Sequence, residues 1–243
     1  MITTVTVHVC PQCGSDRIAK NGKDPRNNKQ KYYCMSCKKY GTLLPSSRYS
    51  EEQKETALRV YQERASLRGV ERALGIARQT VASWLKKKVH TLPPLKASLV
   101  PWQPGDVLEV DELWSFVRLK TQQQWLWIVL CRRSRQVVAF ALGDRSAVTC
   151  RKLWNKIPSS YQQCCSFSDF WSVYALVFPE STHQMVGKDT GETSHVERWN
   201  NTLRQRVGRF VRKTLSFSKK ISFHHMATKL FIFNYNLSVA VRI

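Results

Sequence analysis

Acidic side chains are scarce in this sequence, and they stop well before its end. The 243 residues include 39 lysines and arginines against 17 aspartates and glutamates, which gives a formal net charge of +22. No acidic residue follows Glu197. Such a one-sided balance indicates a polyanionic partner, with nucleic acid as the leading candidate and a membrane surface as the rival.

Long hydrophobic runs and a secretion signal are also absent. The longest apolar runs, WLWIVL and KLFIF, are far shorter than the roughly 18 to 20 residues that a membrane-spanning helix needs. The first residues, MITTVTVHVC, lack a basic region followed by an apolar stretch and a small-residue cleavage site. We therefore expect no membrane partner, and a cytoplasmic protein that associates with the nucleoid.

The cysteines lack the spacing of a secreted disulfide framework. Cys10 and Cys13 form CPQC, and Cys34 and Cys37 form CMSC. Each C-x-x-C turn aims two thiolates at one ion, and four thiolates leave no open position for a substrate, so we predict a structural Zn²⁺ site in a zinc ribbon over residues 1–48. A disulfide or a redox pair is the alternative. The other four cysteines are expected to be reduced and mostly buried: Cys131, Cys150, Cys164 and Cys165.

Residues 49–88 carry the pattern of a helix-turn-helix DNA-binding domain. Ser50 is placed to cap a first amphipathic helix, and Gly75 separates a short second helix from a third. In that motif the third helix enters the major groove, and the side chains that we expect to face DNA are Arg78, Gln79, Thr80, Ser83, Lys86 and Lys87. A plain three-helix bundle is the alternative. Residues 89–105 hold four prolines and no helical period, which indicates a linker.

The remainder, residues 106–243, alternates between strand and helix patterns. We predict strands over 106–117, 124–133, 136–144, 163–170 and 182–187, and helices over 146–158, 171–178 and 194–213. The first helix would bury Val148, Leu153, Trp154 and Ile157, and basic, aromatic helical sequence ends the chain. This α/β order, βββαβαβα, resembles the ribonuclease H-like fold shared by retroviral integrases and the acidic-triad (DDE) transposases.

That resemblance implies a catalytic site. In such enzymes carboxylates from the first strand, the end of the fourth strand and the last helix converge, and those places hold Asp111, Asp169 and Glu197. Three carboxylates can hold two Mg²⁺ ions, or Mn²⁺ as a substitute, for in-line phosphoryl transfer without a protein nucleophile.

Each acid has an alternative reading. Glu109 or Glu112 could replace or assist Asp111, and Glu109 shares its strand face. Asp144 competes weakly with Asp169, although its place after the third strand favours capping the next helix. Glu197 stands three residues after Ser194, which is the spacing of a capping box.

The helix that holds Glu197 becomes basic after it. We expect Val196, Leu203, Val207 and Phe210 to pack on the sheet, together with Trp199 or Asn200. Beside this apolar stripe, the same helix would present a polar face that leads into a basic ridge. We expect this surface to lie next to the metal and to contact DNA phosphates through Asn201, Arg204, Arg206, Arg209, Arg212 and Lys213.

The stretches DVLEVDELWSFV, SDFWSVYALVFP and HQMVGKDTGETSHVERWNNTLRQRVGRFVRKTLSFSK, with the CPQC and CMSC pairs, resemble the transposases of the insertion-sequence-one (IS1) family. The resemblance covers essentially the whole chain. It implies that the amino-terminal domains bind the terminal inverted repeats of a mobile element, and that the catalytic domain cuts and joins double-stranded DNA as a homodimer or higher oligomer. It also implies a ribosomal frameshift near Lys86 to Lys88, and a repressor role for the amino-terminal part alone.

Two other functions compete. His195 and Arg198 have an H-x-x-R spacing and Tyr235 lies downstream, which would suit a tyrosine recombinase. That class needs a largely helical catalytic domain, whereas residues 106–143 have strand patterns. A non-catalytic DNA-binding repressor is the other alternative, and the three acids argue against it.

Overall fold

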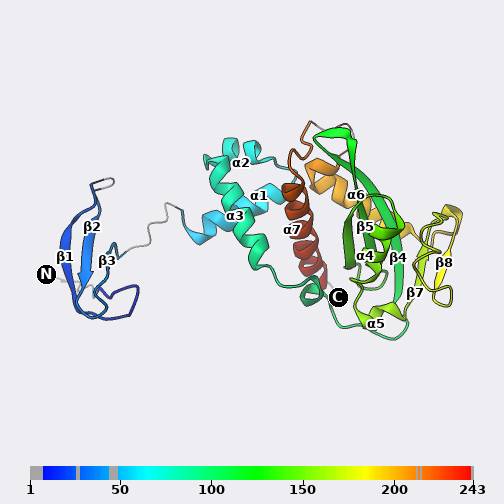
Figure 1. Ribbon diagram of the computed structural model, residues 1–243, viewed down its shortest axis with the longest axis horizontal. Coiled ribbons are helices and arrows are strands. Elements are labelled where there is room, and N and C mark those ends of the chain that lie inside the picture. The colour runs from blue at the N-terminus through cyan, green and yellow to red at the C-terminus, as the bar shows by residue number, and fades with distance from the viewer. Residues whose placement is uncertain (1–7, 26–27, 44–48, 212, 214, 242–243) are drawn as a thin grey trace. The chain divides into compact units, whose positions relative to one another are not determined.

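The computed structural model of the chain describes residues 8–25, 28–43, 49–211, 213 and 215–241. It divides into two compact units, Met1–Gln53 and Lys54–Ile243 (Figure 1). The first unit contains a small antiparallel sheet in the order β1-β2-β3, made of β1 (Ile18–Lys23), β2 (Gln30–Cys34) and β3 (Tyr40–Gly41).

Three helices follow, at the places that the sequence predicts. They are α1 (Glu51–Gln62), α2 (Leu67–Leu74) and α3 (Arg78–Thr91). Ser50 caps α1 as predicted, because its hydroxyl accepts the N–H of Gln53 at 3.1 Å while the Gln53 side chain accepts the N–H of Ser50 at 2.9 Å. Gly75 ends α2 with φ +65°, a left-handed conformation that glycine adopts without a Cβ clash.

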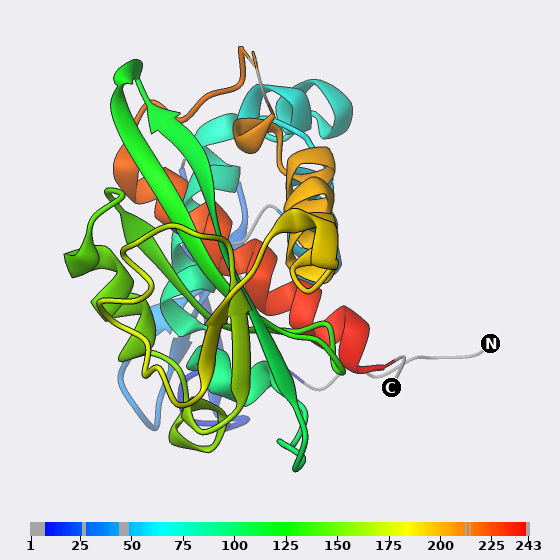
Figure 2. The same ribbon diagram turned by 90° about the vertical axis from the view of Figure 1, so that its right-hand side faces the viewer.

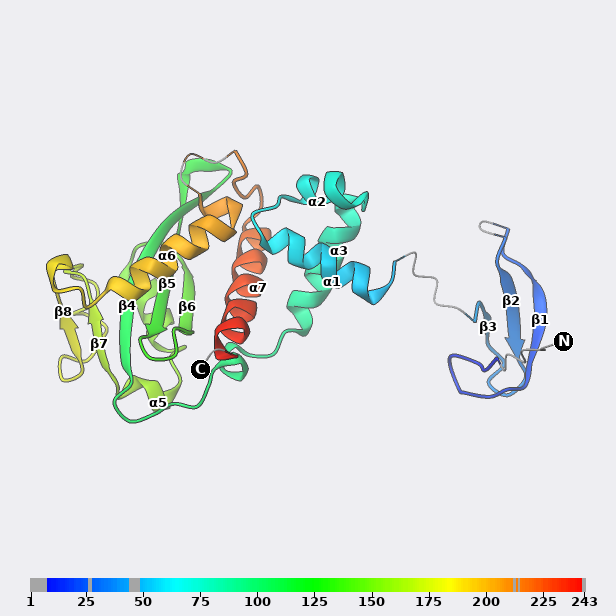
Figure 3. The ribbon, with the colours of Figure 1, turned by 180° about the vertical axis from the view of Figure 1, so that it is seen from behind.

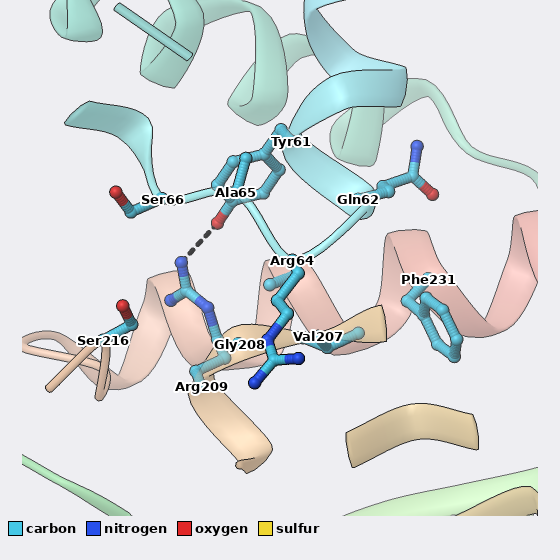
Figure 4. Close-up of a pocket in the computed structure, with 11 residues that line it drawn as sticks. Tyr61, Gln62, Arg64, Ala65, Ser66, Val207, Gly208, Arg209, Ser216 and Phe231 are labelled. Atoms are coloured by element: carbon cyan, nitrogen blue, oxygen red, sulfur yellow. Dashed lines mark hydrogen bonds between the residues drawn. The ribbon is translucent and has the colours of Figure 1, made fainter. Parts of the chain in front are cut away.

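From Lys54 onward, these helices belong to the same compact unit as the larger sheet, and specific contacts join them to it. Arg206 pairs with Glu63 just after α1, and Arg209 donates to the hydroxyl of Tyr61 (Figure 4). The backbone N–H of Arg64 also donates to the carbonyl of Arg206 at 2.6 Å. The end of α1 is therefore attached to the segment that follows the last acidic residue of the chain.

The larger sheet has five strands in the order β6-β5-β4-β7-β8. They are β4 (Val107–Val117), β5 (Leu119–Cys131), β6 (Val137–Gly143), β7 (Cys165–Ser168) and β8 (His183–Met185). β4 pairs antiparallel with β5 and β5 with β6, whereas β7 runs parallel to β4 and β8 parallel to β7. β4 is consequently the central strand, with apolar cores on both of its faces.

Helices cover the two faces of this mixed sheet (Figures 2 and 3). The core on one face includes residues from α4 (Ala147–Trp154), with α5 (Ser159–Gln162) beside it. The other core includes residues from α6 (Ser194–Arg206) and α7 (Ile221–Ala240). Short 3₁₀ turns occur at Leu95–Ser98, Lys188–Thr190 and Gly208–Phe210. The result is a mixed α/β architecture consistent with a ribonuclease H-like domain.

Three sequence predictions need correction. Residues 171–178 form successive turns instead of a helix, because their hydrogen bonds mostly span three residues, as from the Val177 N–H to the Tyr174 carbonyl. α6 ends at Arg206 instead of continuing to residue 213, since Val207 turns extended and Gly208 follows it. Val148 is 64% exposed, so α4 buries a face made of Thr149, Cys150 and Leu153 instead.

Part of the stretch expected to be a linker, residues 89–105, is fixed to the sheet: its first residues end α3, and Leu95, Leu99 and Trp102 pack against the two cores. Ser98 is buried, and its carbonyl accepts from the Gln136 side chain at 2.8 Å. The same side chain accepts the N–H of Val100 at 2.8 Å. Prolines in this segment therefore mark a fixed connection instead of a free tether.

Candidate active site

Strand register brings Asp111 and Asp169 together. Glu109 on β4 stands opposite Phe167 on the parallel strand β7. Two residues further along, Asp111 lies on β4 and Asp169 directly follows the last residue of β7, so continuing the parallel register places these residues side by side where β7 ends. This arrangement depends on a crossover between β6 and β7. Sequence periodicity suggests such a crossover, but it cannot predict which residues of β4 and β7 pair.

Glu197 reaches the same place because Glu109 fixes the beginning of α6. The fully buried Glu109 carboxylate accepts the N–H groups of His195 and Val196, at 2.8 and 2.9 Å. It also contacts Nδ1 of His195 at 2.6 Å and accepts Nε of Arg132 at 2.8 Å. A carboxylate on the central strand thus occupies the position of a helix cap and aligns the first turn that carries Glu197.

The capping box expected between Ser194 and Glu197 does not form. Thr193 is the N-cap residue of α6, and its side chain makes no capping hydrogen bond. Because Glu109 satisfies two free N–H groups of this turn, the Glu197 carboxylate is not needed as a cap; it accepts the hydroxyl of Thr193 at 3.4 Å.

All three acids line one cleft. Its other walls are formed by residues of β4, β5, the loop between β6 and α4, the segment before α6 and α6 itself: Val110, Glu112, Trp125, Arg145, Lys188, Thr193, Asn200, Asn201 and Arg204. Burial, together with the negative charges of Glu112, Asp169 and Glu197, raises the pKa of Asp111 to about 7. Carboxylates crowded in this way favour a bound cation, which would relieve their repulsion.

Arginines neutralise the acids on either side of Asp111. Glu112 is buried, accepts Nε of Arg145 at 2.9 Å and accepts the hydroxyl of Tyr174. Arg132 holds Glu109 and also donates to the Glu192 carboxylate at 2.7 Å. Of the three acids in EVDE, Asp111 is therefore the one without an arginine among the hydrogen bonds described here, which favours it over both neighbours as a metal ligand.

Asn200 is a site residue that sequence reasoning placed on the packing face alone. It is buried, as one of the expected packing residues of α6, and its Nδ2 donates to Oδ2 of Asp111 at 2.6 Å. Its Oδ1 is buried without a hydrogen-bond partner among the described residues. The spacing of Asn200 three residues after Glu197 was the available signal, because positions i and i+3 share a helix face.

The expected basic ridge is divided between two places. Arg204 and Asn201 line the cleft, joined by Arg145 and Lys188, which the sequence did not indicate. Arg206 and Arg209 instead contact Glu63 and Tyr61, because α6 ends where they begin to turn toward α1. Lys213 is exposed, and Arg212 lies outside the described residues.

Other candidates from the sequence have structural partners. Asp144 accepts the hydroxyls of Ser146 and Thr149, at 2.6 and 2.5 Å, at the start of α4. Tyr235 packs against Trp199, with ring centroids 5.9 Å apart, and His195 is bound to Glu109. His195 and Tyr235, which a tyrosine recombinase would need in one site, are thus held by separate structural contacts.

The four amino-terminal cysteines form a group that could hold a metal ion. Their sulfurs all lie within 4.8 Å of one another, with 3.8 Å between Cys10 and Cys37 and 3.6 Å between Cys13 and Cys34. Sulfurs about 2.3 Å from a tetrahedral Zn²⁺ would be about 3.8 Å apart, whereas a disulfide requires about 2.05 Å. Backbone N–H groups of Cys37 and Ser36 lower the pKa of Cys34 to about 6, although burial opposes them.

On α3, the side chains expected to face DNA are accessible to different degrees. Arg78, Gln79, Ser83, Lys86 and Lys87 are exposed, and Thr80 is half-buried. Val81 and Leu85 on the opposite side are buried. No helix in the part of the chain that the structure describes is long and apolar enough to cross a membrane.

Comparison with known proteins agrees with this site. Residues 107–236 match the family model described as IS1 transposase. The iso-IS1n protein InsB of Shigella dysenteriae is 36% identical over 126 residues, which cover 52% of this chain and 93% of that protein. The IS1 4 protein InsB of Escherichia coli K12 is 34% identical over 145 residues, covering 56% and 84% respectively. The chain therefore belongs to the IS1 transposase family and is a transposase.

Proposed function

We propose that the chain is an acidic-triad (DDE) transposase in which Asp111, Asp169 and Glu197 hold two divalent metal ions. The observation that supports this most directly is that acids from the centre of β4, the end of β7 and the first turn of α6 line one cleft. Hard carboxylate oxygens are the ligands that Mg²⁺ and Mn²⁺ prefer. The raised pKa of Asp111 fits a site built for added positive charge.

Bound metal would activate the attacking hydroxyl or water and stabilise the leaving oxygen of the DNA strand. The chain's own residues have supporting roles. Asn200 orients the Asp111 carboxylate, Glu109 aligns the helix that carries Glu197, and Arg132 pairs with Glu109 and holds it in place. Asn201, Arg204, Lys188 and Lys213 are proposed to contact DNA phosphates near the cleft.

The remaining parts are proposed to select the DNA. The four cysteines would hold a structural Zn²⁺ in a zinc ribbon, and α1 to α3 would act as a helix-turn-helix, with the exposed side chains of α3 facing double-stranded DNA. Their target would be the terminal inverted repeats of the mobile element. Pairing two such ends calls for a homodimer or a higher oligomer.

The test is cleavage and strand joining on labelled DNA that carries the element's ends, in Mg²⁺ and in EDTA. Asp111→Asn, Asp169→Asn and Glu197→Gln should each abolish cleavage while DNA binding survives. Glu63→Gln, which removes an acid outside the cleft, should retain cleavage. Cleavage that persists in EDTA would contradict the proposal, and a covalent adduct lost in Tyr235→Phe would establish a recombinase instead.

A further inference from the structure

A second basic surface lies away from the cleft, at the far end of the β4–β5 hairpin. It is a groove lined by the hairpin residues Val117, Arg118, Gln122 and Gln124 and by the start of α7, Lys219, Lys220, Ile221 and Ser222. We call this the hairpin groove. Arg118, Lys219 and Lys220 are exposed there.

Both walls of the hairpin groove come from stretches without acids. No aspartate or glutamate occurs between Glu112 and Asp144, and none follows Glu197. Within the described residues, Arg118, Lys219 and Lys220 form no ion pair with a carboxylate. Positive side chains from two distant segments therefore meet without neutralisation, which is the electrostatic pattern of a polyanion-binding surface.

Buried hydrogen bonds fix the two walls against each other. The N–H of Arg118 donates to the carbonyl of Ser218 at 2.8 Å. The buried imidazole of His224 lies 3.0 Å from the Ser218 hydroxyl and 3.1 Å from the Ser115 hydroxyl, so it links α7 to β4. Lys219 and Lys220 directly follow this anchored serine, and a groove held in this way loses little entropy when a ligand binds.

The position of the hairpin groove fits a DNA duplex. Val117 lies six residues along β4 from Asp111, about 20 Å at roughly 3.3 Å per residue, which equals about six base pairs. On its other side, Lys86 of α3 lies over the ring of Phe223, 5.6 Å from the centroid, next to the groove residue Ser222. Basic residues thus continue from the carboxyl-terminal half of α3 to the hairpin.

We propose that the hairpin groove binds the phosphate backbone of double-stranded DNA a few base pairs from the cleavage point. The inference rests on the proposed DNA substrate, and it assigns that substrate a contact outside the helix-turn-helix and the cleft. The duplex could be the flank of an element end or the target, and both present the same phosphates.

The experiment compares the full-length double variant Lys219→Glu/Lys220→Glu with a control of equal charge change, Lys96→Glu/Lys152→Glu. Both control lysines are exposed and lie outside the groove, near the 3₁₀ turn at Leu95–Ser98 and on α4. Binding is measured against salt concentration, on a random-sequence duplex and on one carrying an element end. Thermal unfolding establishes that both variants fold.

The groove variant should bind duplex DNA roughly tenfold or more weakly than the control. The slope of its log affinity against log salt concentration should be smaller in magnitude by about two. An equal loss on the two duplexes assigns the groove to DNA of any sequence, as contact with a target requires, and a loss confined to the duplex with the element end assigns it to the flank. If the two variants have equal affinities and equal salt slopes while the parent binds and cleaves DNA, the proposal for the hairpin groove is overturned and the proposed function stands. A parent that binds no duplex would overturn both proposals.

Discussion

At the scale of residues, the EVDE stretch illustrates what the sequence could and could not decide. Apolar alternation predicted an acid in the middle of a strand, and three acids within four residues competed for the role. The choice depends on Arg132 and Arg145, which are distant in sequence and bind Glu109 and Glu112. Partners of this kind arise from tertiary packing, so periodicity alone could not assign them.

Asn200 gives a prediction at the same scale. Asn200→Ala removes the donor that orients Asp111, and cleavage should fall by about 10- to 100-fold with a higher Mg²⁺ requirement. The exposed Asn155 at the end of α4 provides a matched control, because Asn155→Ala removes the same group away from the cleft. A rate and Mg²⁺ requirement for Asn200→Ala equal to those of the control would show that this hydrogen bond is dispensable.

At the scale of elements, strands were easier to predict than the segments between them. The expected strand at 106–117 and the packing face of α6 are confirmed. The buried positions of α6 recur at helical spacing, whereas β4, as the central strand, is buried on both faces. The helix predicted over residues 171–178 was wrong because Tyr174 and Phe178 are buried four residues apart, which is also a helical spacing. One four-residue hydrogen bond does join them, from the Phe178 N–H to the Tyr174 carbonyl at 2.9 Å, but the turns around it do not continue as a helix.

The start of α6 gives a second prediction. Glu109→Gln keeps the shape of the side chain but removes its negative charge. That charge accepts hydrogen bonds from two backbone N–H groups of α6 and also contacts the side chains of Arg132 and His195. Stability in urea should fall by about 1.5–3 kcal/mol, and half-maximal cleavage should need more Mg²⁺. The exposed pair of Glu63 and Arg206 provides the comparison, since Glu63→Gln should cost about 0–1 kcal/mol. An unchanged Mg²⁺ requirement would limit Glu109 to a structural role.

The link between α7 and β4 gives a pH prediction. Burial, together with the positive charges of Arg209 and His225, lowers the pKa of His224 to about 3. Because the folded pKa lies below the usual value of about 6.5, the unfolded chain binds the proton first, and stability is lost as pH falls from about 6.5 toward 3. Urea midpoints across this range should fall less steeply in His224→Gln. A parallel decline in both proteins would contradict this assignment.

At the scale of the whole molecule, the one-sided charge correctly indicated a nucleic-acid partner, but composition could not place the helices against the sheet. Glu63 and Arg206 are 143 residues apart, and neither belongs to a local motif. Such pairs place α1 to α3 and the sheet in one compact unit, although the sequence suggested separate domains joined by a linker.

The amino-terminal unit gives a prediction at this scale. Removing metal with a chelator, or replacing Cys13 with alanine, should unfold residues of the first unit and leave the second folded, because little apolar surface replaces the metal there. Limited proteolysis of the full chain would measure this. Cys165→Ala, at an exposed cysteine outside the group, should keep both units resistant. Resistance of the first unit without metal would contradict a structural zinc site.

The most direct measurement of the central claim is the metal preference of Asp111→Cys. A thiolate is a poor ligand for Mg²⁺ and a better one for Mn²⁺, so the side chain that binds the ion should determine which metal supports cleavage. We predict that Asp111→Cys loses cleavage in Mg²⁺ and regains part of it in Mn²⁺, whereas the parent works with both. Parental activity of Asp111→Cys in Mg²⁺ would show that Asp111 does not bind the catalytic metal.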